Sequence, residues 1–200
     1  MLVPAETYNR QNMIVYPPPP SIVVGVGGIG TWVAILLAMS GCSKISIMDD
    51  DSIEQSNLAR LPFAWNVVGQ KKTGALTEFI TNIRPDLELQ TYGRANDVTL
   101  LLVEGDILFD CTDNQDVQVM LSEWCHKRGK QYIRVGYDSF HITVTSTPSG
   151  WSSDGSREGY SVTPSWVVPA LIAACDGLVK ATVNRELETS RDVRKNVKEE

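Results

Sequence analysis

Apolar residues along the chain form short β-branched runs that alternate with longer, helix-like segments. The first run, Ser21-Ile22-Val23-Val24, precedes a segment over residues 29–39 that is apolar on all sides, as a buried helix is. The same patterns predict further helices over residues 72–83, 117–127 and 167–183, and further strands over residues 44–48, 87–91, 106–110, 131–135 and 140–145. Strands separated by helices of this length predict an α/β fold: a Rossmann-like, doubly wound, mainly parallel sheet with helices on both faces.

Three segments differ from this pattern. Residues 1–20 predict an N-terminal arm that ends in a stiff spacer, Pro17 to Pro20, because prolines cannot donate hydrogen bonds to a sheet. Residues 146–165 are rich in Ser, Gly, Thr and Pro and predict a flexible loop. Residues 188–200 predict a charged tail in solvent. The remaining span, residues 21–187, has the length of one domain.

Charge and hydropathy narrow the classes of function. The formal net charge of -6 and the pI of about 5.0 disfavour an extended basic surface for nucleic acid. No apolar run reaches the ~18 residues that cross a bilayer, and the N-terminus lacks the pattern of a signal peptide. We therefore expect a cytoplasmic protein that binds neither a membrane nor an extended nucleic acid.

Four cysteines, Cys42, Cys111, Cys125 and Cys175, are widely spaced and form no Cys-x-x-Cys pair. This spacing disfavours a disulfide framework and a zinc site, so we expect no zinc. Free cysteine is among the most buried residue types, which predicts four structural thiols, with Cys175 as a core residue of the last helix. Whether any of the four is reactive stays open.

The segment Gly25-Val26-Gly27-Gly28-Ile29-Gly30 joins the first strand to the first helix. Glycines let the backbone approach a phosphate, and the following helix presents unpaired N–H groups and the positive end of its dipole. The strand before and the helix after are the context that a dinucleotide- or nucleotide-binding loop requires. A tight strand-to-helix turn without a ligand is the structural alternative.

Three carboxylates, Asp49, Asp50 and Asp51, follow the second strand. Asp49 is placed to accept hydrogen bonds from ribose hydroxyls, which suits NAD as well as ATP. A carboxylate ~5 Å from a phosphate costs about 3 kcal/mol at an effective dielectric constant of ~20, so the three cannot all face a bare triphosphate. We expect Asp49 on the ribose, and Asp51 either near Mg²⁺ or as a simple loop acid.

The residues that separate ATP from NAD come next. Asn57 and Arg60 follow the acidic triplet, and Lys72 stands at the start of the next helix with Lys71 beside it. Hydride transfer needs none of these cations. Displacing pyrophosphate from ATP does, because negative charge moves onto the leaving phosphates and fixed cations stabilise it.

Together these motifs resemble the ThiF/MoeB/HesA family, relatives of the adenylation domains of ubiquitin-activating E1 enzymes. The matching pieces are Tyr8-Asn9-Arg10-Gln11, the glycine loop, the stretch from Asp49 to Arg60, Lys72, and Asp110-Cys111-Thr112-Asp113-Asn114. The segment from Pro169 to Lys180 also looks like a later packing helix of the family. On this resemblance, residues 21–187 are an E1-like adenylation domain, and residues 146–165 are its crossover loop.

The resemblance implies roles for individual residues. Arg60 and Lys72 would bind the phosphates, with Asn57 beside them, and Asp113 would hold Mg²⁺ near the attacked α-phosphate. Helix capping by Asp113 is an alternative that does not exclude metal binding. The expected ATP-binding residues are Gly25, Gly27, Gly28, Gly30, Asp49, Asp51, Asn57, Arg60, Lys72, Asp113 and Asn114; the expected catalytic residues are Arg10, Arg60, Lys72 and Asp113.

Arg10 carries the implication for oligomeric state. In the family, this arginine reaches into the ATP site of the neighbouring subunit, which implies a homodimer in which Arg10 acts in trans. A solvated arginine on a free terminus is the alternative that the sequence leaves open.

The reaction implied by the resemblance is attack of a carboxylate on the α-phosphate of ATP, giving an acyl adenylate and pyrophosphate. The implied substrate is a ubiquitin-like, β-grasp protein with a C-terminal glycine. The chain departs from relatives that carry zinc-binding cysteine pairs or a reactive cysteine in the crossover loop, because residues 146–165 contain no cysteine. A thioester step of its own is therefore not expected.

Other readings of the sequence stay open. The substrate could be a peptide or a small carboxylate linked to tRNA, although the acidic balance weighs against tRNA. The chain could be a nucleotide-binding partner without turnover, which the joint presence of Arg10, Asn57, Arg60, Lys72 and Asp113 disfavours. An NAD-dependent oxidoreductase is the last alternative.

Overall fold

The computed structural model describes residues 5–148 and 165–196, and its described strands form one sheet in the order β3-β2-β1-β4-β5-β6-β7. The strands are β1 (Ser21–Val24), β2 (Lys44–Met48), β3 (Glu88–Tyr92), β4 (Ile107–Asp110), β5 (Gln131–Asp138), β6 (His141–Thr145) and β7 (Thr189–Asp192). β1 to β5 are parallel, and β6 and β7 are antiparallel additions at one edge. The predicted Rossmann-like, mainly parallel sheet is confirmed.

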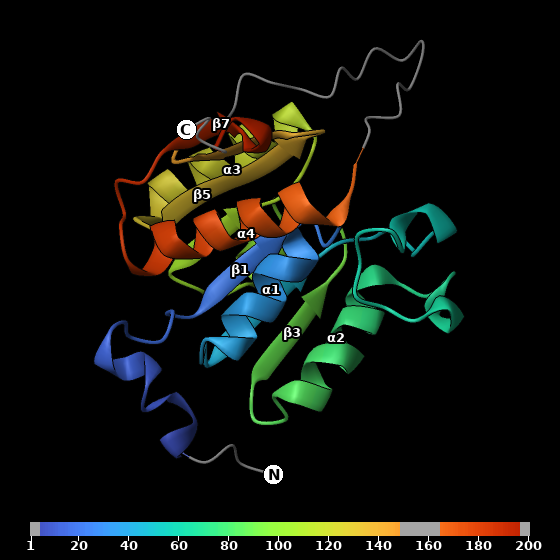
Figure 1. The fold of residues 1–200 in the computed structure, drawn as a ribbon, viewed down its shortest axis with the longest axis horizontal. Helices are drawn as coiled ribbons and strands as arrows, with labels where there is room; N and C mark the ends of the chain where they lie inside the picture. Colours follow the sequence, from blue (N-terminus) through green and yellow to red (C-terminus); the bar gives the residue numbers. More distant parts are fainter. Residues whose placement is uncertain (1–4, 149–164, 197–200) are drawn as a thin grey trace.

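The helices are α1 (Gly30–Met39), α2 (Lys72–Ile83), α3 (Gln115–Arg128) and α4 (Val167–Thr182). One apolar cluster joins α1, α2 and α4 to one face of the sheet, and a second cluster joins α3 to the opposite face. Figure 1 shows α1 and α4 in front of the strands, α3 behind them and α2 beside β3. Within the described ranges, no helix combines the length and apolar character that crossing a membrane requires.

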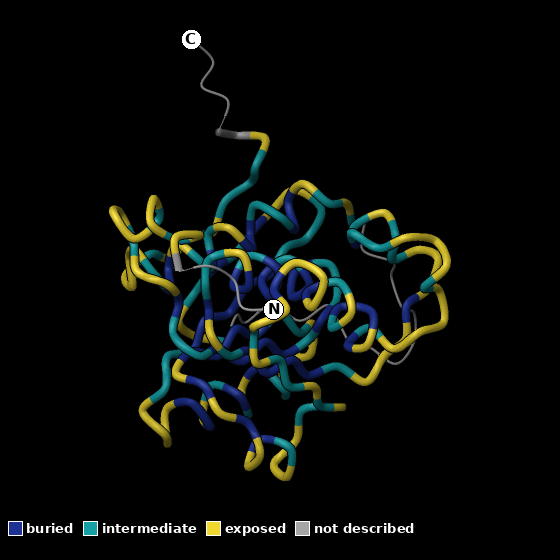
Figure 2. Tube along the Cα trace, turned by 90° about the horizontal axis from the view of Figure 1, so that it is seen from below, coloured by how far each residue is buried: buried dark blue, intermediate teal, exposed yellow. Residues whose placement is uncertain are grey.

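The core explains why β1 is apolar at consecutive positions rather than at alternate ones. Val23 belongs to the cluster beneath α1 and α4, whereas its neighbour Ile22 belongs to the cluster beneath α3, and both are fully buried. A parallel sheet covered on both faces requires this pattern. Figure 2 shows buried segments, in dark blue, towards the centre of the molecule and exposed segments, in yellow, around them.

The register of the central strands brings three of the predicted motifs to one edge of the sheet. Val24, the last residue of β1, pairs with Met48 of β2 on one side and with Asp110 of β4 on the other. The loops after these three strands therefore open side by side. β1 and β4 are also the neighbours at which the strand order reverses, and ligands of doubly wound sheets bind at such a switch point.

The predicted charged tail over residues 188–200 is wrong in part, because residues 189–192 form β7 against β6. Lys180 on α4 holds the connection: its fully buried ammonium donates to the carbonyls of Arg185 and Leu187 and to Glu188 Oε1. Of the predicted loop over residues 146–165, residues 149–164 lie outside the described residues.

Candidate active site

The glycines of the loop differ in whether the fold requires a glycine at that position. Gly25 adopts φ +82°, and a Cβ on Gly30 would lie 1.9 Å from the carbonyl oxygen of Gly25. The strand-to-helix turn therefore requires both glycines. By contrast, a Cβ on Gly27 would meet no atom within 4 Å. Gly27 is thus free of any packing reason to be glycine, and it leaves the backbone open to a ligand.

The first turn of α1 faces this open backbone. α1 begins at Gly30, and its N-cap residue Ile29 makes no side-chain capping hydrogen bond. Uncapped N–H groups at a helix start, together with the positive end of the helix dipole, favour an anion. The open loop and the start of α1 therefore have an arrangement that suits a phosphate group.

Asp49 connects the glycine loop to the end of β2. Its Oδ2 accepts from the N–H of Val26 at 2.8 Å, and its Oδ1 accepts from the N–H of Asp51 at 2.8 Å. Burial raises the pKa of Asp49, opposed by the charge of Lys72 and by these two hydrogen bonds. Each carboxylate oxygen can accept further hydrogen bonds, so the structural role leaves room for the expected ribose contact.

The two lysines before and at the start of α2 lie in different places. Lys72 Nζ forms an ion pair with Asp51 Oδ2 at 2.7 Å, and its side chain is only 13% exposed. Lys71 Nζ instead donates to the main-chain carbonyl of Asp50 at 2.5 Å. Because the charge of Lys72 also acts on Asp49, Lys72 is the lysine that belongs to the site.

Arg60 lies directly across the glycine loop. A Cβ on Gly28 would come within 2.8 Å of Arg60 Cδ, so the missing side chain is what admits the arginine. Arg60 Nη1 donates to the carbonyl of Ser56 at 3.1 Å, and Trp32 on α1 donates its indole N–H to the carbonyl of Arg60 at 3.0 Å. The sequence pattern did not reveal Trp32, because a tryptophan in an apolar helix reads as core.

Asn57 has a local role in the turn before Arg60. Its side-chain oxygen accepts from the N–H of Glu54 at 3.2 Å, as half of a capping box around the 3-10 helix Gln55–Asn57. This contact fixes the turn that presents Arg60. Asn57 therefore relates to the site by holding the turn before Arg60.

Asp113 and Asn114 follow β4 at the same edge of the sheet. Asn114 is the N-cap of α3, and its Oδ1 accepts from the N–H of Val117 at 3.1 Å. The alternative that Asp113 caps this helix is therefore wrong, because the next residue does so. Asp113 is exposed, and a carboxylate is the kind of hard oxygen ligand that Mg²⁺ prefers.

The carboxylates of the acidic triplet are largely committed to contacts within the protein. Carboxylate oxygens of Asp49, Asp50 and Asp51 lie within 4.8 Å of one another. However, both oxygens of Asp49 accept backbone hydrogen bonds, and Asp51 is paired with Lys72. Asp51 therefore acts with Lys72 as an ion pair beside the glycine loop.

Arg10 lies far from the glycine loop. The arm is anchored at the C-terminal end of α1, where Gln11 Nε2 donates to the carbonyl of Ser40 at 2.7 Å. The glycine loop lies at the other end of α1, whose 10 residues span about 15 Å. Figure 1 shows the arm in dark blue near the start of β1, opposite the edge where the strands end.

The cysteines lie in different surroundings. Cys42 and Cys125 are buried, as predicted, and Cys111 is half-buried beside the glycine loop. Burial raises the pKa of Cys111 well above its usual range and that of Cys125 to about 12, so both stay protonated at neutral pH. The prediction that Cys175 is a core residue is wrong. Ala173, Ala174 and Gly177 form the buried stripe of α4, and Cys175 is exposed.

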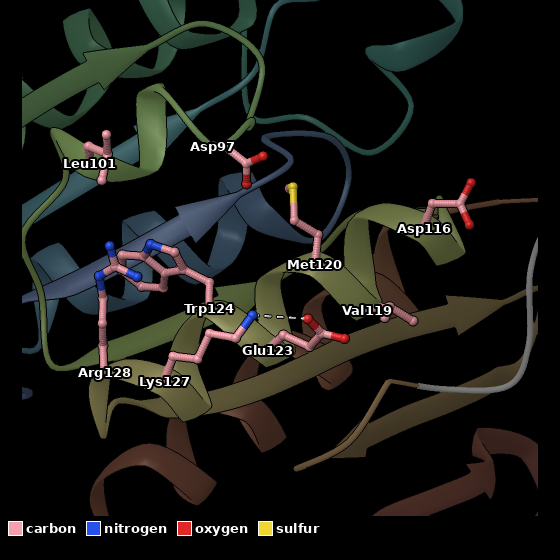
Figure 3. A pocket seen from close by; sticks show the side chains of 9 residues that line it. All are labelled: Asp97, Leu101, Asp116, Val119, Met120, Glu123, Trp124, Lys127 and Arg128. Carbon is pink, nitrogen blue, oxygen red and sulfur yellow. Dashed lines mark hydrogen bonds and ion pairs between the residues drawn. The ribbon is translucent and has the colours of Figure 1, made fainter.

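A separate pocket of about 510 Å³ lies on the outer face of α3. Figure 3 shows side chains of α3 lining it together with Asp97 and Leu101 from the segment before β4. The guanidinium of Arg128 stacks on the Trp124 ring, 4.8 Å from its centroid. None of the residues expected to bind ATP lines this pocket, so it is distinct from the site at the switch point.

Comparison with known proteins agrees with the motifs at the switch point. A sequence profile of the ThiF family matches residues 21–162. The chain belongs to the ThiF family. That span contains the glycine loop, the Arg60 and Lys72 segment and Asp113, and it excludes the arm that carries Arg10.

Among curated proteins, this ThiF-family chain is 30% identical over 132 residues to Ubiquitin-like modifier-activating enzyme 5 of Dictyostelium discoideum, covering 58% of the chain and 34% of that protein. It is 36% identical over 119 residues to tRNA threonylcarbamoyladenosine dehydratase 2 of Saccharomyces cerevisiae, covering 56% of the chain and 27% of that protein. The matched region is thus about a third or less of either relative's length. Among solved structures, E. coli MccB with ATP has the same fold, with a TM-score of 0.70 and 19% identity, covering 88% of this chain and 64% of that one.

Proposed function

We propose that this ThiF-family chain binds ATP at the switch point between β1 and β4 and adenylates a carboxylate, releasing pyrophosphate. The observation that carries the proposal is the position of Arg60, which lies across Gly28 of an otherwise open glycine loop. A dinucleotide oxidoreductase has no use for an arginine over its phosphate loop together with a half-buried lysine, Lys72, beside it. Pyrophosphate departure uses both.

The chemistry requires positioning more than acid-base catalysis. An ionised carboxylate is already a nucleophile at neutral pH, so attack on the α-phosphorus needs no protein base. Arg60 and Lys72 stabilise the charge that develops on the leaving pyrophosphate, and the open backbone at Gly27 admits the phosphates. Asp113 would hold Mg²⁺, which supplies positive charge to the phosphates when it is bound.

The substrate that we propose is a ubiquitin-like, β-grasp protein with a C-terminal glycine. The name of the Dictyostelium relative, Ubiquitin-like modifier-activating enzyme 5, supports this substrate class. The name of the yeast relative instead favours a carboxylate linked to tRNA, but the net charge of -6 gives this chain little attraction for tRNA. A peptide substrate, or a nucleotide-binding role without turnover, is the remaining alternative.

Exchange of labelled pyrophosphate into ATP tests the function. We expect exchange that depends on an added β-grasp protein ending in glycine. Arg60→Ala, Lys72→Ala and Asp113→Ala should each lower the exchange rate by about 10²-fold or more with folding intact. Lys71→Ala is the matched control, because Lys71 is the neighbouring lysine and bonds the main-chain carbonyl of Asp50 instead of a site carboxylate. Exchange without any carboxylate dependence, or binding of NADH in place of ATP, would overturn the proposal.

We further propose a homodimer in which Arg10 completes the partner's site. An arginine at the far end of α1 cannot contribute within its own subunit, because its side chain reaches less than the length of that helix. Mixing inactive Arg10→Ala and Asp113→Ala subunits should restore part of the activity, since one of the two composite sites is then intact. No restoration despite subunit exchange would contradict a trans role.

A further inference from the structure

The chain between β4 and α3 is held by a buried polar network that the adenylation chemistry does not use directly. Asp110 is fully buried, and its Oδ1 accepts from both the N–H and the hydroxyl of Thr112, at 2.9 and 2.7 Å. Its Oδ2 accepts from the hydroxyl of Tyr132 on β5 at 2.6 Å. Both oxygens of this carboxylate are therefore committed to holding the loop.

Neighbouring elements also hold the backbone of residues 110–112, at the start of this loop. Arg134 on β5, which is 4% exposed, donates from Nη1 to the carbonyl of Asp110 at 3.0 Å. The N–H of Cys111 donates to the carbonyl of Val24, and Gln118 on α3 donates to the carbonyl of Thr112 at 3.3 Å. The loop is thus fixed by β1, β5 and α3 in the residues just before Asp113.

Burying Asp110 and Arg134 costs hydration free energy that an apolar core would not lose. A buried carboxylate and a buried guanidinium each lose several kcal/mol of hydration, and apolar side chains of similar size would stabilise a core at least as well. Among the described residues, Arg134 Nε has no acceptor at all. A group of this kind is retained where it fixes one conformation, and here that conformation is the loop that carries Asp113.

We propose that Asp110, Thr112, Tyr132 and Arg134 form a buried anchor that positions Asp113 for the reaction. The inference rests on the proposed function for its chemical consequence. On that proposal Asp113 would hold Mg²⁺ beside the phosphates, and the four anchor residues act through Asp113. A shift of about 1 Å in such a loop can cost up to about 10²-fold in rate, which is large enough to measure.

The test uses neutral substitutions, because removing Asp110 or Arg134 would leave the other charge buried without its neighbour. Thr112→Val removes the hydroxyl that donates to Asp110 and keeps the shape, whereas Thr112→Ser keeps the hydroxyl. Tyr132→Phe removes only the other donor, and it serves where Thr112→Val fails to fold. The holoenzyme is assayed for pyrophosphate exchange with the β-grasp substrate and increasing Mg²⁺.

We expect kcat to fall at least about 10-fold in Thr112→Val and Tyr132→Phe, with more Mg²⁺ needed for half-maximal activity. Thr112→Ser should restore kcat. A merely structural role would lower thermal stability in the variants and leave kcat of the folded protein unchanged. Equal rates in Thr112→Val and Thr112→Ser would overturn the proposal.

A binding measurement separates this inference from the proposed function. Calorimetric titration with ATP, in Mg²⁺ and in EDTA, gives the gain in affinity that Mg²⁺ provides. The anchor predicts a smaller gain in Thr112→Val than in Thr112→Ser, and an equal affinity in EDTA. Absence of carboxylate-dependent exchange in the wild type would overturn the proposed function alone. If Mg²⁺ raised the ATP affinity of Thr112→Val as much as that of Thr112→Ser, the anchor alone would be overturned.

Discussion

Gly27, Gly28 and Gly30 of the phosphate loop differ in what an added methyl group would meet. At Gly30 it would meet the carbonyl of Gly25 at 1.9 Å, at Gly28 the side chain of Arg60 at 2.8 Å, and at Gly27 nothing within 4 Å. Of these three, only Gly27 therefore lacks a steric reason to be glycine. The difference makes alanine substitutions in this loop diagnostic of a ligand.

We expect Gly27→Ala to fold normally and to bind ATP at least about 10-fold more weakly, which corresponds to about 1.4 kcal/mol. The methyl group occupies space that is empty in the protein and that phosphates need. Gly30→Ala is the contrasting variant: its clash with the backbone should lower the free energy of unfolding by about 3 kcal/mol or more. Calorimetric titration with ATP and urea unfolding measure the two effects. Unchanged ATP affinity in Gly27→Ala would exclude the loop as the phosphate site.

Gly28→Ala tests the position of Arg60. The added methyl group contacts the middle of the arginine side chain, which can move, so we expect normal stability and a rate of exchange about 10-fold lower. In an Arg60→Ala background, Gly28→Ala should not lower the exchange rate further, because the side chain that it displaces is absent. Additive losses in the double variant would show that Gly28 acts independently of Arg60.

At the residue scale, the sequence predicted which side chains gather at the site better than what each one contacts. Asp49 bonds the glycine loop, Arg60 lies across Gly28 and Lys72 pairs with Asp51, and their roles toward ATP stay predictions. That Asn114 rather than Asp113 caps α3 depends on a difference of one position along the backbone, which residue type does not determine. The indole contact between Trp32 and Arg60 had no signal in the pattern, because it joins segments 28 residues apart.

At the scale of elements, helices and strands with a strong apolar pattern were predicted accurately, and a strand without one was missed. α1, β1 and β2 were predicted within one residue because their apolar patterns are unambiguous. β7 was missed because Thr189, Ser190, Arg191 and Asp192 show no apolar alternation. An edge strand of this kind is held by its partner β6 and by the contacts of Lys180, and both lie at a distance along the chain.

Lys180→Met tests how much this connection depends on one buried cation. The substitution leaves the carbonyls of Arg185 and Leu187 without their donor, while the half-exposed Glu188 can turn to water. We expect the free energy of unfolding in urea to fall by about 2–3 kcal/mol. Lys127→Met, at an exposed ion pair on α3, is the control and should have almost no effect. Equal stability of the two variants would contradict the role of Lys180.

At the scale of the whole molecule, the sequence predicted that the motifs meet at one edge of the sheet. It did not predict where the N-terminal arm lies. Parallel strands end on the same side, so motifs that follow β1, β2 and β4 had to meet there. Nothing in the arm indicated where it would lie. Its position follows from contacts of Tyr8 and Gln11 with the end of α1, which separates Arg10 from the other site residues of its own subunit.

The arm also exposes apolar side chains that a second subunit would cover. Met13, Ile14 and Tyr16 are 82%, 87% and 84% exposed, which is unusual for three large apolar residues so close together. If these residues contact a second copy of the chain, then Ile14→Ser should leave the subunit stable and weaken self-association. Val98→Ser is the matched control, because Val98 is 68% exposed in the segment between β3 and β4, outside the arm.

Sedimentation equilibrium measures the association, and exchange assays at several protein concentrations measure its consequence. We expect Ile14→Ser to raise the dissociation constant of the dimer about 10-fold, since one buried isoleucine contributes about 1.5 kcal/mol or more. Its activity should fall on dilution and recover at high concentration, because only the dimer supplies Arg10 in trans. Val98→Ser should follow the wild type at every concentration. A wild-type protein that is fully active as a monomer would contradict both the dimer and the trans arginine, and it would leave the ATP site at the switch point as a self-sufficient one.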